Sequence, residues 1–168
     1  WWLRGWDDDP ESNLGCELQS RDTLEEHVRE AFNDHRTRRL IVASHHPLLS
    51  YGPYGGAFST PADLGKQGDD LVTMLVRGAG LAPQHQNHPR ARAYAEMLLK
   101  DAERFGSFLF VSGHDESLQY RKLEKQTQLI AGSAGRNPTP VGGAREGELS
   151  VSTPGWAEVV ITPTSGTV

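Results

Sequence analysis

Two short, unbroken apolar runs constrain the fold of this chain more than any other feature. Residues 39–44 read RLIVAS, and residues 107–113 read SFLFVSG. Runs of this length without polar alternation are typical of strands that are buried on both faces of a sheet. We therefore expect two neighbouring buried strands, over residues 39–44 and 108–112.

A helix is expected before each of these strands. The TLEE sequence at 23–26 fits a capping box, and apolar residues recur every fourth position after it, which predicts a helix from Thr23 to about Asn33. A second helix is predicted over 91–105, because its apolar residues share one face and Gly106 is a natural stop. Most of the connection from 45 to 89 reads as loop, with a short helix over 70–76.

The remainder of the chain is rich in strand patterns. Residues 117–123 (SLQYRKL) alternate like a half-exposed strand, and 126–132 (QTQLIAG) follow as its hairpin partner. After a glycine-rich loop over 133–147, two closing strands are expected, ELSVS at 148–152 and WAEVVIT at 156–162. This order predicts a layered fold of mixed α and β structure in a single domain over 1–168, with the late strands adding to one sheet edge.

Charge and composition exclude several classes of protein. The formal net charge is -5 and no basic face is visible, which argues against a nucleic-acid-binding surface. No apolar run approaches the roughly 20 residues of a membrane span. Cys16 is the single cysteine, so no disulfide framework exists within the chain. The sequence starts at Trp1 without Met, and a missing signal sequence therefore assigns no compartment, cytoplasmic or extracytoplasmic.

Both apolar runs lead into a histidine. His45 follows the first run and His114 follows the second, with Gly113 expected to let the backbone turn sharply before His114. In layered α/β proteins the carboxyl ends of strands face the ligand crevice, and imidazole is the commonest metal ligand near neutral pH. The residues alone thus predict a metal or phosphate site, the alternative being two structural, hydrogen-bonded histidines.

Four segments taken together resemble a known family. HHP after an apolar strand, SYGPYGG, SGHDESLQY and QLIAGSAGRNPTP resemble, in order and spacing, the calcineurin-like metallophosphoesterases, which include the purple acid phosphatases. The resemblance extends over nearly the whole chain, from the initial WWL to TPGWAEVVIT at 153–162. It implies a four-layer β-sandwich flanked by helices, in which a metal-bound hydroxide attacks a phosphate ester at a pair of Fe, Mn or Zn ions.

The resemblance also assigns metal ligands. His45 corresponds to the first histidine of an H-x-P pattern, and His114 to the first histidine of a GHxH pattern, and both would bind the same ion. Glu116 stands where the family has a second histidine of that pattern. A carboxylate binds the same metals, so Glu116 is expected to be a ligand. Alternatively, this change marks a non-catalytic relative that binds phosphate or a partner.

The other ligands of the family come from D-x-H, GDxxD and GNHD or GNHE segments, which this sequence lacks. GDD at 68–70 is not followed by the required residues and reads as a solvated helix start. The resemblance therefore implies the carboxy-terminal half of such a domain, with at most one partial metal site and no activity alone. Its partner would be the amino-terminal half or a second copy, covering exposed apolar edges.

Several further residues near these motifs are candidates for the site. His46 is interpreted as a donor or acid toward the substrate phosphate, or as part of the loop packing. Tyr51 and Tyr54 line the pocket or cover an edge of the core. Asp115 orients His114 through its carboxylate, or is a turn residue.

The remaining candidates are two histidines, two loop residues and three tryptophans. His85 and His88 are predicted to be solvent-exposed loop residues. Arg136 and Asn137 lie in a glycine-rich loop that could face the crevice. The tryptophans at positions 1, 2 and 156 are expected to lie in or beside the core.

Overall fold

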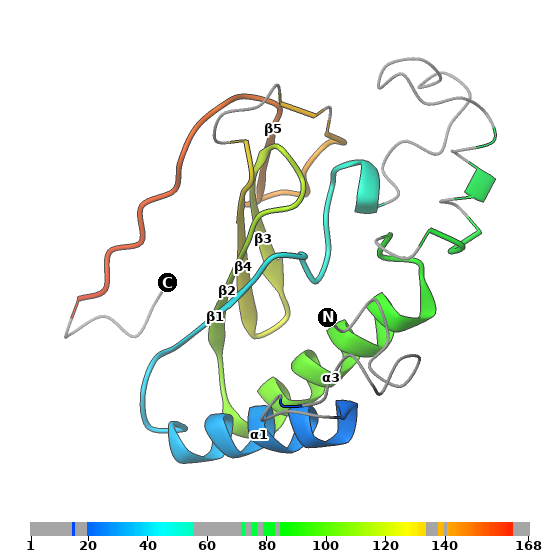
Figure 1. Ribbon diagram of the computed structural model, residues 1–168. Coiled ribbons are helices and arrows are strands. Elements are labelled where there is room, and N and C mark those ends of the chain that lie inside the picture. Colours follow the sequence, from blue (N-terminus) through cyan, green and yellow to red (C-terminus); the bar gives the residue numbers. More distant parts are fainter. Residues whose placement is uncertain are drawn as a thin grey trace.

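The computed structural model describes residues 15, 20–55, 72, 75–76, 79–82, 85–133, 138–139 and 141–162. These residues form a five-stranded sheet with two helices, α1 (Arg21–Asp34) and α3 (Pro89–Phe105), and a short 3₁₀ helix, η4 (Pro53–Gly55) (Figure 1). The strands are β1 (Leu40–Ser44), β2 (Phe108–Ser112), β3 (Leu118–Leu123), β4 (Gln126–Ala131) and β5 (Leu149–Val151). The fold is thus a mixture of α and β structure, as the sequence predicts.

The strand order in the sheet is β1-β2-β4-β3-β5. Strands β1 and β2 are parallel neighbours, with Leu40 opposite Phe108 and Ser44 opposite Ser112, and α3 lies between them along the chain. The predicted hairpin of β3 and β4 is confirmed, and β5 adds to the outer side of β3 in antiparallel fashion. The neighbouring positions predicted for the two apolar runs are therefore confirmed, and their carboxyl ends are level with each other.

The burial predicted for the first apolar run is wrong. In the described sheet β1 is an edge strand, and its side chains alternate between half-buried and exposed, with Ile41 49% exposed. Strand β2 lies between β1 and β4, and its residues Phe108, Leu109 and Phe110 are buried. Four consecutive apolar residues favour a strand, but they do not determine how many neighbours that strand has.

One hydrophobic core joins the helices to one face of the sheet. Its buried members come from both helices, from β2, from the end of β3 and from the loop after β1: Phe32, Leu48, Ala95, Leu98, Ala102, Phe108, Phe110 and Leu123. Among the described residues this is one sheet with helices against one face, and the four-layer sandwich stays a prediction. Neither described helix has both the length and the apolar character that a membrane span requires.

The helix boundaries are set by capping groups. Helix α1 begins at Arg21, two residues before the predicted Thr23, because the Ser20 hydroxyl oxygen accepts a hydrogen bond from Thr23 N at 3.1 Å and caps the helix. Helix α3 begins at Pro89, since proline favours the first turn, where its missing N–H costs nothing. Gly106 ends α3 as predicted, with φ of 122°.

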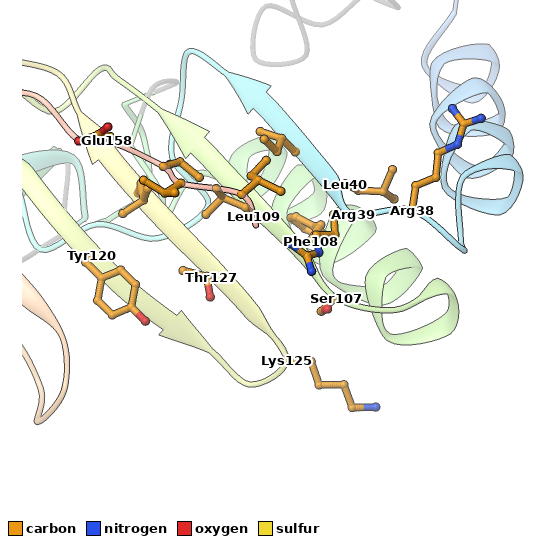
Figure 2. Close-up of a pocket in the computed structure, with 15 residues that line it drawn as sticks. Arg38, Arg39, Leu40, Ser107, Phe108, Leu109, Tyr120, Lys125, Thr127 and Glu158 are labelled. Carbon is orange, nitrogen blue, oxygen red and sulfur yellow. The ribbon is translucent and has the colours of Figure 1, made fainter. Parts of the chain in front are cut away.

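The closing strand predicted over 156–162 is absent from the described structure. Residues 154–162 have no regular secondary structure, and Trp156 is 74% exposed rather than part of the core. The outer edge of β3 is already paired with β5, so the alternating pattern of this segment has no strand beside it there. Residues 158–161 instead line a groove of about 570 Å³ with Leu109, Tyr120 and Thr127 of the sheet (Figure 2).

Some predictions fall partly or wholly outside the described residues. Of the short helix expected over 70–76, the described residues Val72, Leu75 and Val76 are helical. Cys16, the GDD sequence at 68–70 and the first two tryptophans lie outside the described residues, as do Arg136 and Asn137.

Candidate metal centre

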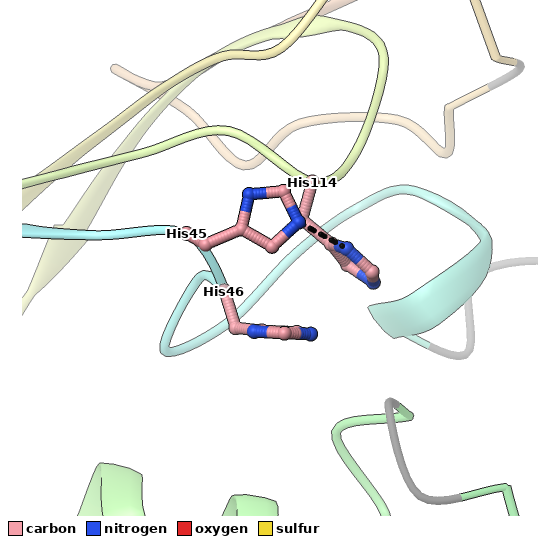
Figure 3. A group of neighbouring side chains, drawn as sticks. All are labelled: His45, His46 and His114. Carbon is pink, nitrogen blue, oxygen red and sulfur yellow. Dashed lines mark hydrogen bonds between the residues drawn. The ribbon is translucent and has the colours of Figure 1, made fainter. Parts of the chain in front are cut away.

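Three histidines meet at the carboxyl ends of β1 and β2 (Figure 3). His45 Nε2 lies 3.2 Å from His114 Nδ1, and the ring of His46 lies 4.2 Å from the ring of His114 between centroids. One ring nitrogen of each residue lies within 4.8 Å of the others. The predicted closeness of His45 and His114 is confirmed, and His46 belongs to the same cluster.

The parallel register of β1 and β2 places these side chains. Because Ser44 is opposite Ser112, the next residues of both strands emerge at the same end of the sheet, and Gly113 N donates a hydrogen bond to His45 O at 3.2 Å. The sharp turn expected at Gly113 falls one residue later. His114 itself has the left-handed conformation, with φ of 65°, which directs its ring toward the loop that follows β1.

Side-chain amides of the sheet hold the loop after β1. The carbonyl oxygen of the Gln128 side chain accepts hydrogen bonds from Leu48 N at 2.8 Å and Leu49 N at 3.2 Å. The side-chain oxygen of Gln119 accepts a bond from Tyr51 N at 2.8 Å. Both glutamines are buried, so these bonds replace water for backbone groups that have no strand partner.

A fully buried carboxylate joins the two histidine loops. Asp115 follows His114 directly and accepts a hydrogen bond from the hydroxyl of Ser50, which belongs to the loop after β1. The Ser50 oxygen in turn accepts a bond from Gly52 N at 2.8 Å. The sequence suggested that Asp115 orients His114, and the structure connects its carboxylate to the loop that follows the other two histidines.

Burial keeps two of the three imidazoles neutral. The pKa of His46 is lowered from 6.5 to about 4 by burial and by the neighbouring His45. The pKa of His114 is likewise lowered from 6.5 to about 4, by burial first and then by His46 and His45. Both rings are therefore unprotonated at pH 7, and a neutral imidazole is the form that binds metals.

The donor set fits one metal ion. In a tetrahedral site with metal–nitrogen bonds of about 2.0 Å, the nitrogens lie about 3.3 Å apart, close to the 3.2 Å between His45 and His114. Nε2 of His46 and Nε2 of His114 are buried, and no hydrogen-bond partner for either lies in the described part of the chain. Three imidazole nitrogens suit Zn, Fe and other first-row ions rather than Mg or Ca.

Glu116 lies outside the three-histidine cluster. The expectation that it projects beside His114 assumed extended backbone at both positions, whereas His114 is left-handed, so the simple alternation of side chains does not apply there. Glu116 is half-buried, and its carbonyl oxygen accepts a hydrogen bond from Thr139 N at 2.7 Å. Within the described ranges, the three histidines are the one group with three close metal-ligating side chains.

The two loop tyrosines have different environments. The ring of Tyr54, in η4, lies 4.2 Å from the ring of His114 between centroids and covers one side of the cluster. The hydroxyl of Tyr51 donates to the carboxylate of Glu148, and the guanidinium carbon of Arg121 lies 4.1 Å from the centroid of its ring. Tyr54 is thus beside the candidate site, whereas Tyr51 anchors the loop to β3 and the chain before β5.

The exposure predicted for His85 is wrong. His85 is 1% exposed, and its Nδ1 accepts a hydrogen bond from Asn87 N at 3.1 Å. Its neighbour Gln86 accepts a bond from Ser50 N at 3.1 Å, so the 85–87 segment packs against the loop after β1. His88 is half-buried and caps α3, with its Nδ1 accepting from Arg90 N at 3.2 Å. These histidines therefore support the structure around the site.

Acid is expected to destabilise the fold through the buried imidazoles. The unfolded chain titrates them near pH 6.5 and the folded chain near pH 4, so the unfolded state binds more protons between these values. The contribution of these two imidazoles to the free energy of unfolding is then fully present above pH 6.5 and falls as the pH decreases toward 4. Urea unfolding with EDTA present, at pH 7.5, 6.0 and 5.0, measures how the free energy of unfolding of the wild type depends on pH.

The control for this pH dependence is a double variant, His46→Gln with His114→Gln. It removes both buried imidazoles and leaves the carboxylates unchanged. Its free energy of unfolding should depend less on pH between 7.5 and 5.0 than that of the wild type. Parallel curves for the two proteins would contradict the lowered pKa values.

Comparison with known proteins identifies no relative of this chain. No protein-family model, no curated protein and no solved structure matches it. The indications of function are therefore the sequence motifs and the geometry of the three histidines.

Proposed function

We propose that this chain carries part of the active site of a phosphoester hydrolase of the metallophosphoesterase kind, in which His45, His46 and His114 hold one metal ion. The observation that carries the proposal is the cluster itself, with one nitrogen of each imidazole within 4.8 Å of the others. Of the metals that the resemblance implies, Zn and Fe fit a set of three imidazole donors.

The placement of the cluster supports this proposal independently of the metal. The three histidines follow two adjacent parallel strands, at the sheet end where layered α/β proteins bind ligands. They also fall within HHP and SGHDESLQY, two of the four segments that carry the resemblance to metallophosphoesterases. Local chemistry and sequence pattern thus point to the same residues.

A bound ion would polarise a phosphoryl oxygen and lower the pKa of a water molecule. The chain supplies the groups around it. His46 is neutral at pH 7 and is the third ligand in this proposal, and its low pKa makes it a poor source of a proton. The ring of Tyr54 packs against that of His114, with 4.2 Å between their centroids.

Hydrolysis by two metals requires more ligands than the described cluster contains. Glu116 is outside it, and the sequence has none of the D-x-H, GDxxD and GNHD or GNHE segments. We therefore expect the chain to bind one ion and to lack turnover by itself. In this proposal the other ligands belong to a further part of the protein.

Metal counting and phosphate binding test the proposal. The chain is dialysed against Zn(II) or Co(II), and bound metal is measured by mass spectrometry. We expect about one ion per chain, and a shift of the Co(II) absorption on addition of inorganic phosphate, since a site for a phosphate ester leaves a coordination position open. With p-nitrophenyl phosphate, the chain should be no faster than the same metal buffer. Absence of bound metal would contradict the proposal.

The position of Glu116 favours a second candidate, a non-catalytic relative with one metal that binds phosphate or a partner. The two candidate functions can be distinguished in a longer protein that contains this chain together with the D-x-H, GDxxD and GNHD or GNHE segments. Phosphatase activity lost on His114→Ala supports the hydrolase. Binding of phosphate without hydrolysis of any phosphomonoester or diester supports the non-catalytic relative.

A further inference from the structure

We propose that Asp115, Ser50 and Gln119 form a positioning network that fixes the separation of the two histidine loops and so adjusts the metal site. This inference rests on the proposed function, because it concerns the same three imidazoles. It assigns a role to buried polar side chains that do not themselves bind the ion. The network lies between the start of β3 and the loop that follows β1.

The direction of each hydrogen bond in the network is determined by a backbone amide. Tyr51 N–H can only donate, and it lies 2.8 Å from the side-chain oxygen of Gln119. The amide nitrogen of Gln119 must therefore be the atom that faces Ser50 Oγ at 3.0 Å and Ser117 Oγ at 2.9 Å, and it donates a hydrogen to each.

The same reasoning continues to the carboxylate. Ser50 Oγ accepts from Gly52 N–H at 2.8 Å as well as from the Gln119 amide, which uses both of its lone pairs. Its single hydrogen is then directed to Asp115, whose oxygen accepts it. The amide hydrogens of Tyr51 and Gly52 thus orient the Gln119 amide and the Ser50 hydroxyl, and the bonded network resists displacement of either loop.

The surroundings of Asp115 leave it little freedom. The network side chains Ser50, Asp115, Ser117 and Gln119 are at most 5% exposed. A Cβ atom on Gly52 would lie 2.6 Å from Asp115 Cγ, and one on Gly132 would lie 2.8 Å from the Asp115 carbonyl carbon. The backbone at Gly52 and at Gly132 therefore confines Asp115 on two sides. Because Asp115 is joined to His114 by a peptide bond, its fixed position also restricts that of His114.

The two histidine loops are consequently tied at two points. Gly113 N bonds to His45 O at 3.2 Å on one side of His114, and Asp115 bonds to Ser50 on the other. Metal–ligand distances tolerate changes of about 0.2 Å, so small shifts between the loops weaken binding. Loss of groups that orient ligands typically lowers metal affinity about 10- to 100-fold.

The test compares Co(II) binding by Ser50→Ala, Gln119→Glu and Asp115→Asn with the wild type. Ser50→Ala removes the link, and Gln119→Glu keeps the acceptor for Tyr51 but loses both donors. Each should weaken Co(II) binding about 10- to 100-fold and alter the visible Co(II) absorption. Asp115→Asn retains an acceptor oxygen for Ser50 and should keep affinity closer to the wild type than Asp115→Ala.

The matched control is Asp101→Asn, a buried carboxylate of α3 that lies 3.5 Å from Arg29 of α1. It should lower stability but leave the Co(II) affinity and spectrum unchanged. Wild-type affinity and spectrum in folded Ser50→Ala and Gln119→Glu would overturn the proposal, as would equal effects of the control.

A metal-free measurement separates this proposal from the proposed function. Nuclear Overhauser contacts between the His45 and His114 rings should weaken in Ser50→Ala and persist in Asp101→Asn. If the wild type binds no Co(II), the proposed function fails, and these contacts still decide whether the network positions the histidines. Unchanged contacts in Ser50→Ala would show that it does not.

Discussion

Replacing His45 or His114 by alanine is expected to reduce Co(II) affinity about 100-fold or more. The two nitrogens lie 3.2 Å apart, and each residue supplies one of three imidazoles in the cluster. Removal of a direct ligand should exceed the 10- to 100-fold loss caused by changes in the residues around ligands. Titration followed by Co(II) absorption measures the dissociation constants.

The control for this experiment is His27→Ala, because His27 is an exposed histidine of α1 away from the cluster. Its affinity for Co(II) should equal that of the wild type. If His27→Ala and His114→Ala weaken binding equally, the ion is held by scattered surface histidines, and the three-histidine site is wrong.

Alanine at Gly132 is expected to destabilise the fold by about 3 kcal/mol, the upper part of the range for overpacked sites. The added Cβ would lie 2.8 Å from the Asp115 carbonyl carbon and closer still to its oxygen. Those atoms belong to the backbone, so they cannot rotate away as a side chain would. Gly132 N also bonds to Ser117 O at 3.2 Å, which holds the two segments together. Urea unfolding at pH 7.5 measures the loss.

Gly143→Ala serves as the comparison for Gly132→Ala. No atom lies within 4 Å of a Cβ built on Gly143, and its φ is not in the left-handed range. Its free energy of unfolding should stay within about 0.5 kcal/mol of the wild type, as for ordinary surface changes. A Gly→Ala change by itself lowers the entropy of the unfolded chain and so favours folding. A similar loss in both variants would therefore mean that the close approach to Asp115 does not determine the effect.

Local patterns in the sequence predict the elements of this fold well. The apolar runs at 39–44 and 107–113 became β1 and β2, the alternating segments became the β3–β4 hairpin, and Gly106 ends α3. These features depend on propensities and periodicities within a few residues. Pairing between segments that lie far apart in the sequence cannot be inferred from such local patterns. For this reason β1 was expected to be buried, and the 156–162 segment was expected to be a strand.

The candidate site was predictable in part for the same reason. His45 and His114 follow apolar runs, and parallel strands bring such positions together. The buried glutamines were missed because Gln119 and Gln128 look like the polar side of a half-exposed strand, whereas their side chains face the loop after β1. Residues at alternate positions of a strand lie on the same face. A glutamine at such a position would indicate a buried amide only if the opposite face of the strand were already known to be exposed to solvent.

The left-handed backbone conformation of His114 lowers the stability of the fold that carries the candidate metal site. This conformation costs a residue with a Cβ roughly 1 kcal/mol, whereas glycine adopts it without that cost. His114 nevertheless has φ of 65°. Glycine at this position would relax the turn and delete an imidazole in the same step. The most stable form of this turn and the form that can bind a metal are therefore different sequences, so selection for thermal stability alone would favour losing the site.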